Sequence, residues 1–123
     1  MQNEELVLRN YAHIGDAVWE LFVRNYTVKK TANAKMLHKI TTDRVNAKFQ
    51  MDMLGIINEY LSDEELDFAK RARNIPIPVG RRNIQSIYRQ STAFEALIGY
   101  WYLHDNARLE YFYEKLKDTE FFN

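Results

Sequence analysis

The chain of 123 residues is long enough for one domain, and 46% hydrophobic residues can supply its core. It contains no cysteine, which excludes disulfides, thiolate-bound zinc and cysteine nucleophiles. The formal net charge is zero, so overall charge does not indicate a nucleic-acid binder. The N-terminus is acidic and no long apolar run follows it, so we expect a cytoplasmic protein with no secretory signal and no membrane contact.

Hydrophobic periodicity favours helices nearly throughout, and we therefore expect an all-α fold, a compact helical bundle that forms one domain over residues 1–123. A first helix is predicted over about 6–26. Its residues at core spacing are Ile14, Val18, Leu21 and Phe22. A second helix is predicted over 33–53, followed by a short helical turn over 56–61. The apolar positions of the second helix include Met36, Ile40 and Phe49.

Capping and helix-breaking residues divide the second half of the chain. Ser62 followed by Glu65 has the pattern of a capping box, which predicts a helix over 62–73. The segment 74–80 then interrupts the helices, because its two prolines disfavour helix in the residues before them and its glycine permits a turn. Two further helices are predicted, over 83–103 with Asn83 as the cap and over 107–117.

Charged residues are segregated along this neutral chain. The stretch 29–48 holds six basic residues and one acid, 49–69 holds six acids and no base, and 70–94 holds six bases and no acid. Such segregation can build a basic face that binds a polyanion. The alternative is that the blocks pair with one another at the surface.

Asp16 lies on an unusually apolar helix. At about 100° per residue, the apolar residues of 14–24 cover most of the circumference, so we expect this helix to be mostly buried. Only a narrow stripe remains, formed by Asp16, Glu20 and Arg24. Pairing with Arg24 explains Glu20 but leaves Asp16 without a local partner. A functional role and a structural ion pair both stay open for Asp16.

Glu95 is the only charged residue of the apolar segment 93–103. Its neighbours one helical turn away, none of them basic, are Ser91, Thr92, Ile98 and Gly99. Burying an ionised carboxylate without a partner costs several kcal/mol unless its pKa shifts or a cation compensates. The sequence therefore favours a functional role for Glu95, and the alternative is an ion pair with a basic residue of another helix.

Two acids without partners on two apolar helices suggest one shared cation. Carboxylate oxygens and water suit a hard ion, so Mg²⁺ is expected, with Mn²⁺ as a substitute. The histidines His13, His38 and His104 are scattered and lack the spacing of zinc ligands. A hard metal beside a basic surface indicates phosphodiester hydrolysis, because the metal activates a water and stabilises charge that develops on the phosphate.

The same two segments resemble the ribonuclease III catalytic domain. Residues 14–18, Ile-Gly-Asp-Ala-Val, resemble the centre of the family signature, and residues 94–99, Phe-Glu-Ala-Leu-Ile-Gly, resemble its second acidic motif. The resemblance covers about 8–117 and is greater for the mini-ribonuclease III subfamily, which has no double-stranded-RNA-binding domain. The segments that look like this subfamily are 46–50, 71–74 and 88–92.

This resemblance implies that Asp16 and Glu95 are catalytic residues and metal ligands of a homodimer that cuts both strands of double-stranded RNA. The implied products carry a 5′-phosphate and a 3′-hydroxyl, and the implied substrate is precursor large-subunit (23S) ribosomal RNA. Larger relatives carry further acids where Arg9, Ala12 and Thr92 stand here. A one-metal site, or a second metal recruited only with RNA, is therefore expected.

Basic residues around the proline-containing loop are the candidates for holding RNA. A-form duplexes are recognised mainly through phosphates and 2′-hydroxyls, and we expect the loop between 71 and 83 to reach into a groove or along the backbone. The candidate RNA-binding residues are Lys48, Arg71, Arg73, Asn74, Arg81, Arg82 and Arg89. The alternative for each is an ordinary solvated charge.

Two other functions remain open. One is a catalytically silent ribonuclease III-like protein that binds structured RNA or ribosomal particles, and the presence of both Asp16 and Glu95 disfavours it. The other is a helical interaction module whose acids are structural, and the charge blocks and the arginines around the proline loop disfavour it.

Overall fold

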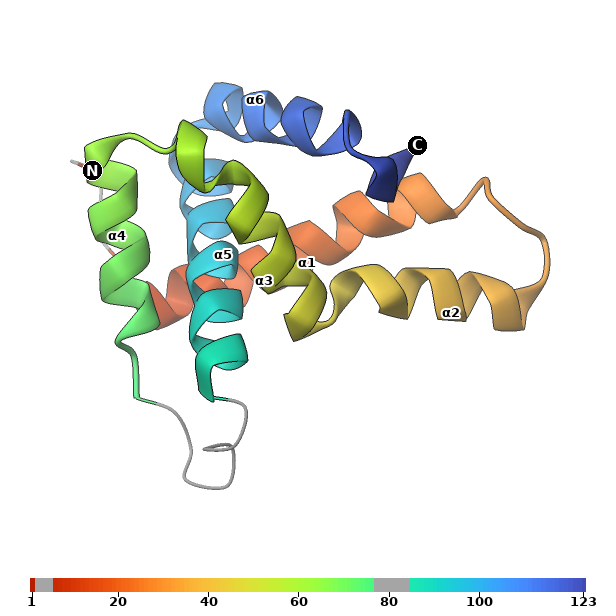
Figure 1. Cartoon of the computed structure of the whole chain (residues 1–123), viewed down its shortest axis with the longest axis horizontal. Helices are drawn as coiled ribbons and strands as arrows, with labels where there is room; N and C mark the ends of the chain where they lie inside the picture. The colour runs from red at the N-terminus through yellow and green to blue at the C-terminus, as the bar shows by residue number, and fades with distance from the viewer. Residues whose placement is uncertain (2–5, 77–84) are drawn as a thin grey trace.

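The chain is all-helical in the part that the computed structural model describes, residues 1, 6–76 and 85–123 (Figure 1). The predicted all-α class is therefore confirmed. The helices are α1 (Leu8–Thr27), α2 (Ala34–Val45), α3 (Ala47–Ile57), the 3-10 turn η1 (Asn58–Tyr60), α4 (Asp63–Arg73), α5 (Gln85–His104), α6 (Asn106–Lys117) and the 3-10 turn η3 (Glu120–Phe122). None of the described helices is both long enough and apolar enough to cross a membrane.

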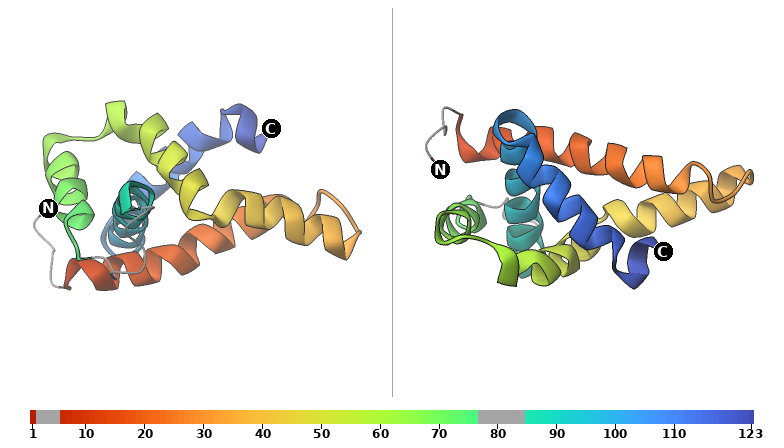
Figure 2. Two further views of the ribbon diagram at one scale, coloured as in Figure 1. Left: turned by 60° about the horizontal axis from the view of Figure 1, so that its bottom comes forward. Right: turned by 90° about the horizontal axis from the view of Figure 1, so that it is seen from above.

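Helix α5 lies at the centre of the molecule. Helices α1, α3, α4 and α6 all pack against it, and α1, α3 and α4 lie around it when it is viewed nearly along its axis (Figure 2, left). Its residues from Ala93 to Trp101 are buried except Glu95, which is half-buried. A helix enclosed on several sides has to be apolar on several faces, which explains why a single charge stands out in this segment.

Two glycines let α1 and α5 cross with their backbones in contact. A Cβ added to Gly15 would lie 1.7 Å from the backbone oxygen of Glu95, and one added to Gly99 would lie 1.9 Å from the backbone oxygen of Tyr11. Side chains do not fit at such distances, so close packing requires glycine at both positions. Because Asp16 follows Gly15, this crossing brings the two candidate acids together.

The prediction of one continuous second helix is wrong, because the chain bends at Asn46 and forms two helices, α2 and α3. Asn46 has an extended backbone, and its side chain accepts a hydrogen bond of 2.8 Å from the Phe49 N–H, as an N-cap residue does. The apolar spacing continues across the break, so the pattern hides it. The predicted capping box of Ser62 and Glu65 is confirmed at the start of α4.

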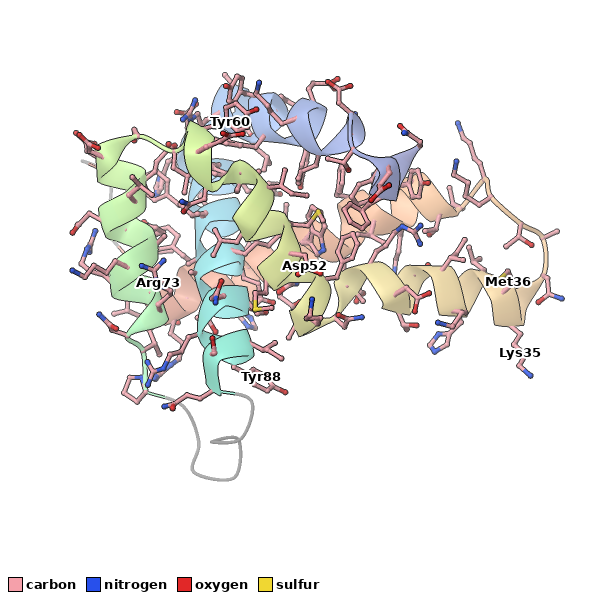
Figure 3. The ribbon with its side chains drawn as sticks, in the orientation of Figure 1. Lys35, Met36, Asp52, Tyr60, Arg73 and Tyr88 are labelled. Carbon is pink, nitrogen blue, oxygen red and sulfur yellow. The ribbon has the colours of Figure 1, made fainter. Side chains whose placement is uncertain are left out.

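The expectation that α1 is buried on most of its circumference is also wrong. Trp19, Phe22 and Val23 fill the interior, but Asp16 and the predicted core residue Leu21 are exposed. The neighbouring helices cover only part of the circumference of α1, which leaves one face of this helix open. Met36, an apolar position of the second predicted helix, is exposed as well, near the tip of α2 (Figure 3).

An ion pair between the buried Glu65 and the half-buried Arg108 joins α4 to α6. The carboxylate of Glu65 accepts hydrogen bonds from the Arg108 guanidinium at 2.7 and 2.8 Å and from the Trp101 indole at 3.0 Å. Burial alone would raise the pKa of Glu65, but the Arg108 guanidinium and the Ser62 backbone N–H lower it. This acid is therefore fully paired, unlike Glu95.

Candidate active site

Asp16 and Glu95 line one pocket of about 390 Å³ between α1, the end of α4 and the first half of α5. Tyr88, which also lines it, marks this end of α5 in Figure 3, and Arg73 marks the neighbouring end of α4. The lining residues are Arg9, Ala12, His13 and Asp16 from α1, Ala72 from α4, Ile75 and Pro76 after it, and Tyr88, Arg89, Thr92 and Glu95 from α5. The structure therefore brings the two predicted acids to one concave surface.

The two carboxyl groups interact directly. Asp16 is exposed, whereas Glu95 is half-buried and lies within hydrogen-bonding reach of Asp16. Burial and the neighbouring Asp16 carboxyl group raise the pKa of Glu95 to about 8. A cation between the two groups would offset both effects.

Neither acid forms an ion pair within the described part of the chain, whereas the stripe residues Glu20 and Arg24 form the predicted pair at 3.3 Å. The described residues contain no group of three or more His, Asp or Glu side chains that could hold a metal by themselves. Asp16 and Glu95 can thus supply two carboxylate ligands to a hard cation.

The three positions where the resemblance implies additional acids in larger relatives all line this pocket. They hold Arg9, Ala12 and Thr92 here. The pocket is therefore poorer in carboxylates and richer in positive charge than the full family pattern implies. Arg9 and His13 are pocket residues that are not among the predicted site residues, although the resemblance marks position 9 and His13 lies three residues before Asp16 on α1.

The predicted RNA-binding residues lie in different surroundings. Arg89 lines the pocket and donates a hydrogen bond of 2.6 Å to the Arg73 carbonyl, which ties α5 to the end of α4. Arg71 is exposed and pairs with Asp67 at 3.1 Å. Arg73 is half-buried and Asn74 is exposed at the C-terminus of α4.

Lys48 lies on α3, does not line the pocket, and pairs with Asp52 at 2.8 Å. Its contact with RNA stays a prediction. Arg81 and Arg82, like the helix cap expected at Asn83, lie outside the described residues.

Gln50 is a further residue of the site that the sequence did not single out. It lies on α3, is buried, and directs its amide nitrogen to Glu95 Oε2 at 3.5 Å. Ser91, one turn before Glu95 on α5, donates a hydrogen bond to the Gln50 side chain. The sequence signal that could have indicated Gln50 is that a polar residue stands at a position where the helical period of α3 places apolar residues.

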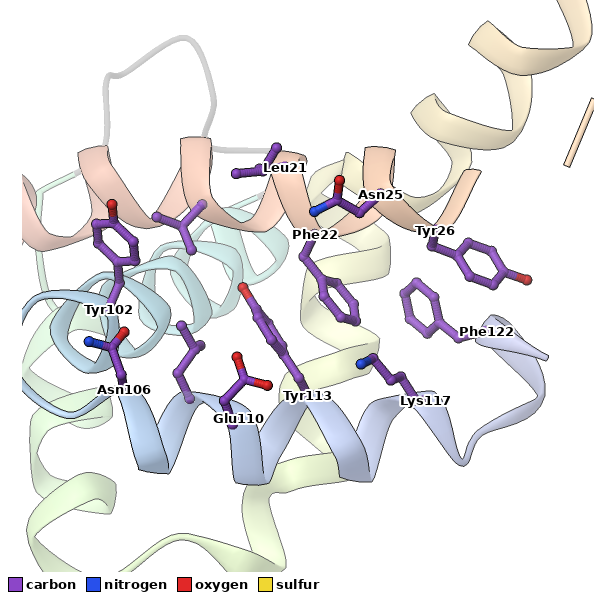
Figure 4. A pocket seen from close by; sticks show the side chains of 12 residues that line it. Leu21, Phe22, Asn25, Tyr26, Tyr102, Asn106, Glu110, Tyr113, Lys117 and Phe122 are labelled. Carbon is purple, nitrogen blue, oxygen red and sulfur yellow. The ribbon is translucent and has the colours of Figure 1, made fainter. Parts of the chain in front are cut away.

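A second pocket, of about 570 Å³, lies between α1 and α6 (Figure 4). Leu21, Phe22 and Tyr26 line it from α1, and Tyr113 lines it from α6. Its lining is mainly apolar and Glu110 is its only acid. This pocket is larger than the first, but it offers no pair of carboxylates to a metal and is not the candidate active site.

Comparison with known proteins shows the family to which this all-helical domain belongs. The sequence model described as the Ribonuclease III domain matches residues 9–106, a range that includes both acids. The chain therefore belongs to the ribonuclease III family, whose members are endoribonucleases that act on double-stranded RNA.

Within this family the chain belongs with the mini-ribonucleases III. It is 39% identical to Mini-ribonuclease 3 of Gloeobacter violaceus over 89% of this chain and 81% of that protein. It is 41% identical to Mini-ribonuclease 3 of Clostridium tetani over 80% of this chain and 68% of that protein. The crystal structure of a protein from Fusobacterium nucleatum matches with a TM-score of 0.77 and 30% identity, over 92% of this chain and 93% of that one.

Proposed function

We propose that this protein is a Mg²⁺-dependent endoribonuclease that cleaves double-stranded RNA, with Asp16 and Glu95 as catalytic metal ligands. The observation that carries the proposal is the direct approach of two carboxyl groups that have no cationic partner within the described residues. Oxygen ligands without nitrogen or sulfur suit Mg²⁺, and Mn²⁺ can take its place. The bound metal would activate a water and stabilise charge on the scissile phosphate.

The residues of the pocket divide this work between them. Asp16, exposed at the pocket surface, and Glu95, behind it, present oxygens from two helices whose separation is set by the glycine crossing. Arg9 and Arg89 on the pocket wall place positive charge where an RNA phosphate would approach. Arg71, Arg73 and Asn74, at the end of α4 beside this pocket, extend the polar surface along which a duplex would lie.

The substrate, the location and the assembly are finer parts of the same proposal. We propose that the duplex is a stem of precursor 23S ribosomal RNA, cut in the cytoplasm to leave 5′-phosphate and 3′-hydroxyl ends, and that two copies of the chain form a homodimer. Similarity to the mini-ribonucleases III supports the substrate. The exposed apolar residues beside the second pocket support the homodimer.

Incubation of the purified chain with a labelled RNA duplex and with a matched single strand, with and without Mg²⁺, tests the activity. We expect cleavage of the duplex alone, and only with the metal. Duplex binding without cleavage by the wild-type chain would instead identify a silent RNA-binding protein. Absence of both binding and cleavage would favour an interaction module.

A further inference from the structure

Gln50 and Ser91 form a buried hydrogen-bonded pair behind Glu95. Their exposed fractions are 1% and 5%, and they come from α3 and α5 respectively. The Ser91 hydroxyl donates to Gln50 Oε1 at 2.5 Å. The Gln50 amide nitrogen lies 3.4 Å from the Val45 carbonyl and 3.5 Å from Glu95 Oε2.

These contacts define which way the Gln50 amide points. A backbone carbonyl only accepts hydrogen bonds, so the amide group facing Val45 has to be the NH₂. The carbonyl end of the amide then faces the Ser91 hydroxyl, which has a proton to donate. The second hydrogen of the NH₂ is left for Glu95, and a reversed amide would set Gln50 Oε1 against the Val45 oxygen.

The Gln50 amide, held in this orientation, affects the geometry of the candidate site. A hydrogen bond from the Gln50 amide to Oε2 of Glu95 would restrict rotation of the carboxyl group and leave its other oxygen for the pocket. The 3.5 Å contact is long, and hydrogen bonds at reactive sites are often long until the bound species is present. Donors behind a metal ligand orient it in this manner in other proteins.

We propose that Gln50, oriented by Ser91, is a positioning residue that holds Glu95 for metal binding. This inference rests on the proposed function, because it assumes that Glu95 is a metal ligand. It assigns to α3 a part in the site, although α3 contributes no lining residue to the pocket.

The test is the affinity of the full chain for Mn²⁺ without RNA, measured by electron paramagnetic resonance of the free ion. Gln50→Leu removes the amide at similar volume, and Ser91→Ala removes the hydroxyl that orients it. We expect a Kd for Mn²⁺ about tenfold weaker in Gln50→Leu and a smaller weakening in Ser91→Ala. The Mg²⁺ concentration for half-maximal cleavage should rise in parallel, more than the rate at saturating Mg²⁺ falls.

Two matched variants separate positioning from a general loosening of the fold. Thr41→Val breaks another buried hydroxyl contact, the 2.9 Å hydrogen bond between Thr27 and Thr41. Ser86→Ala removes an exposed serine from α5. We expect Thr41→Val to lower the Tm and leave the Kd for Mn²⁺ unchanged, and Ser86→Ala to change neither.

The possible outcomes are distinguishable. Wild-type Mn²⁺ affinity in Gln50→Leu, with loss of affinity in Glu95→Gln, would overturn the role of Gln50 and leave the metal site standing. Equal affinity in wild type and Glu95→Gln would overturn the metal site and this inference together. If Gln50→Leu does not fold, Ser91→Ala decides, and wild-type affinity in that variant overturns the proposal. An equal loss in Thr41→Val would also contradict it.

Discussion

At the scale of residues, the candidate site consists of two carboxyl groups, and their like charges repel each other. From the residues alone, the sequence favours a functional role only for Glu95, a lone charge on an apolar helix, and leaves Asp16 open; the resemblance to the ribonuclease III signature points to both. The sequence could not predict Gln50, Arg9 or His13. An uncharged amide at an apolar position and polar residues on an exposed helix face have many ordinary explanations, and only the packing of α3 and α5 shows where the amide points.

The raised pKa of Glu95 predicts a pH-dependent stability in the absence of metal. Its folded-state pKa of about 8 exceeds the ordinary value of 4.5, so between these values the folded chain keeps a proton that the unfolded chain releases. The free energy of unfolding should therefore fall as the pH rises through this window. Urea denaturation in a chelating buffer at about pH 5.5 and pH 8.5 should show a loss on the order of 2 kcal/mol after allowance for solvent screening.

Glu95→Gln provides the comparison for this pH dependence. The variant should lack that part of the pH dependence and should be more stable than wild type at the higher pH. Glu20→Gln, which alters an exposed pair on the same helix as Asp16, should keep the wild-type slope. Parallel curves for wild type and Glu95→Gln would show that Glu95 titrates normally.

At the scale of elements, the crossing of α1 and α5 sets the distance between the two acids. Most helices could be predicted because their apolar spacing and their caps agree, as at Ser62. The break at Asn46 could not be predicted, because the apolar period runs through it and one cap-favouring asparagine does not by itself fix where a helix begins. The sequence could not predict the need for glycine at Gly15 and Gly99 either, because each glycine faces the backbone of a helix that is distant in the sequence.

Alanine at each of three glycines tests this crossing. Gly15→Ala and Gly99→Ala would force a methyl group into the facing backbone, so each should lower the free energy of unfolding by about 3 kcal/mol or more. Gly55, on α3, has open space around its Cβ position, and Gly55→Ala should be neutral or stabilise by about 0.5–1 kcal/mol. Chemical denaturation measures all three, and equal effects at the three positions would contradict the proposed packing.

At the scale of the whole molecule, Leu21 of α1 and Tyr102 of α5 form an exposed apolar face. Leu21 is 61% exposed and Tyr102 is 45% exposed, and both line the pocket between α1 and α6 (Figure 4). The sequence placed Leu21 in the core because the helical period is the same for residues that pack inside a chain and residues that pack between chains. This face is the surface through which we propose that two copies pair.

Leu21→Asp tests the proposed homodimer by placing a charge in the apolar face. We expect a dimeric mass for the wild-type chain in light scattering and a monomeric mass for the variant, at unchanged helical content. Leu66→Asp, at an exposed leucine on α4, should remain dimeric. A monomeric wild-type chain at micromolar concentration, or a dimeric Leu21→Asp variant, would contradict the pairing of this face.

The most direct test of the central claim is the cleavage rate of duplex RNA by Asp16→Asn and Glu95→Gln in Mg²⁺, measured beside their affinity for the same duplex. We expect both variants to lose about 100-fold or more in rate while they still bind the duplex. Glu20→Gln, one helical turn from Asp16 and paired with Arg24, should cleave like wild type. Cleavage at the wild-type rate by either Asp16→Asn or Glu95→Gln would contradict the assignment of that residue to the active site.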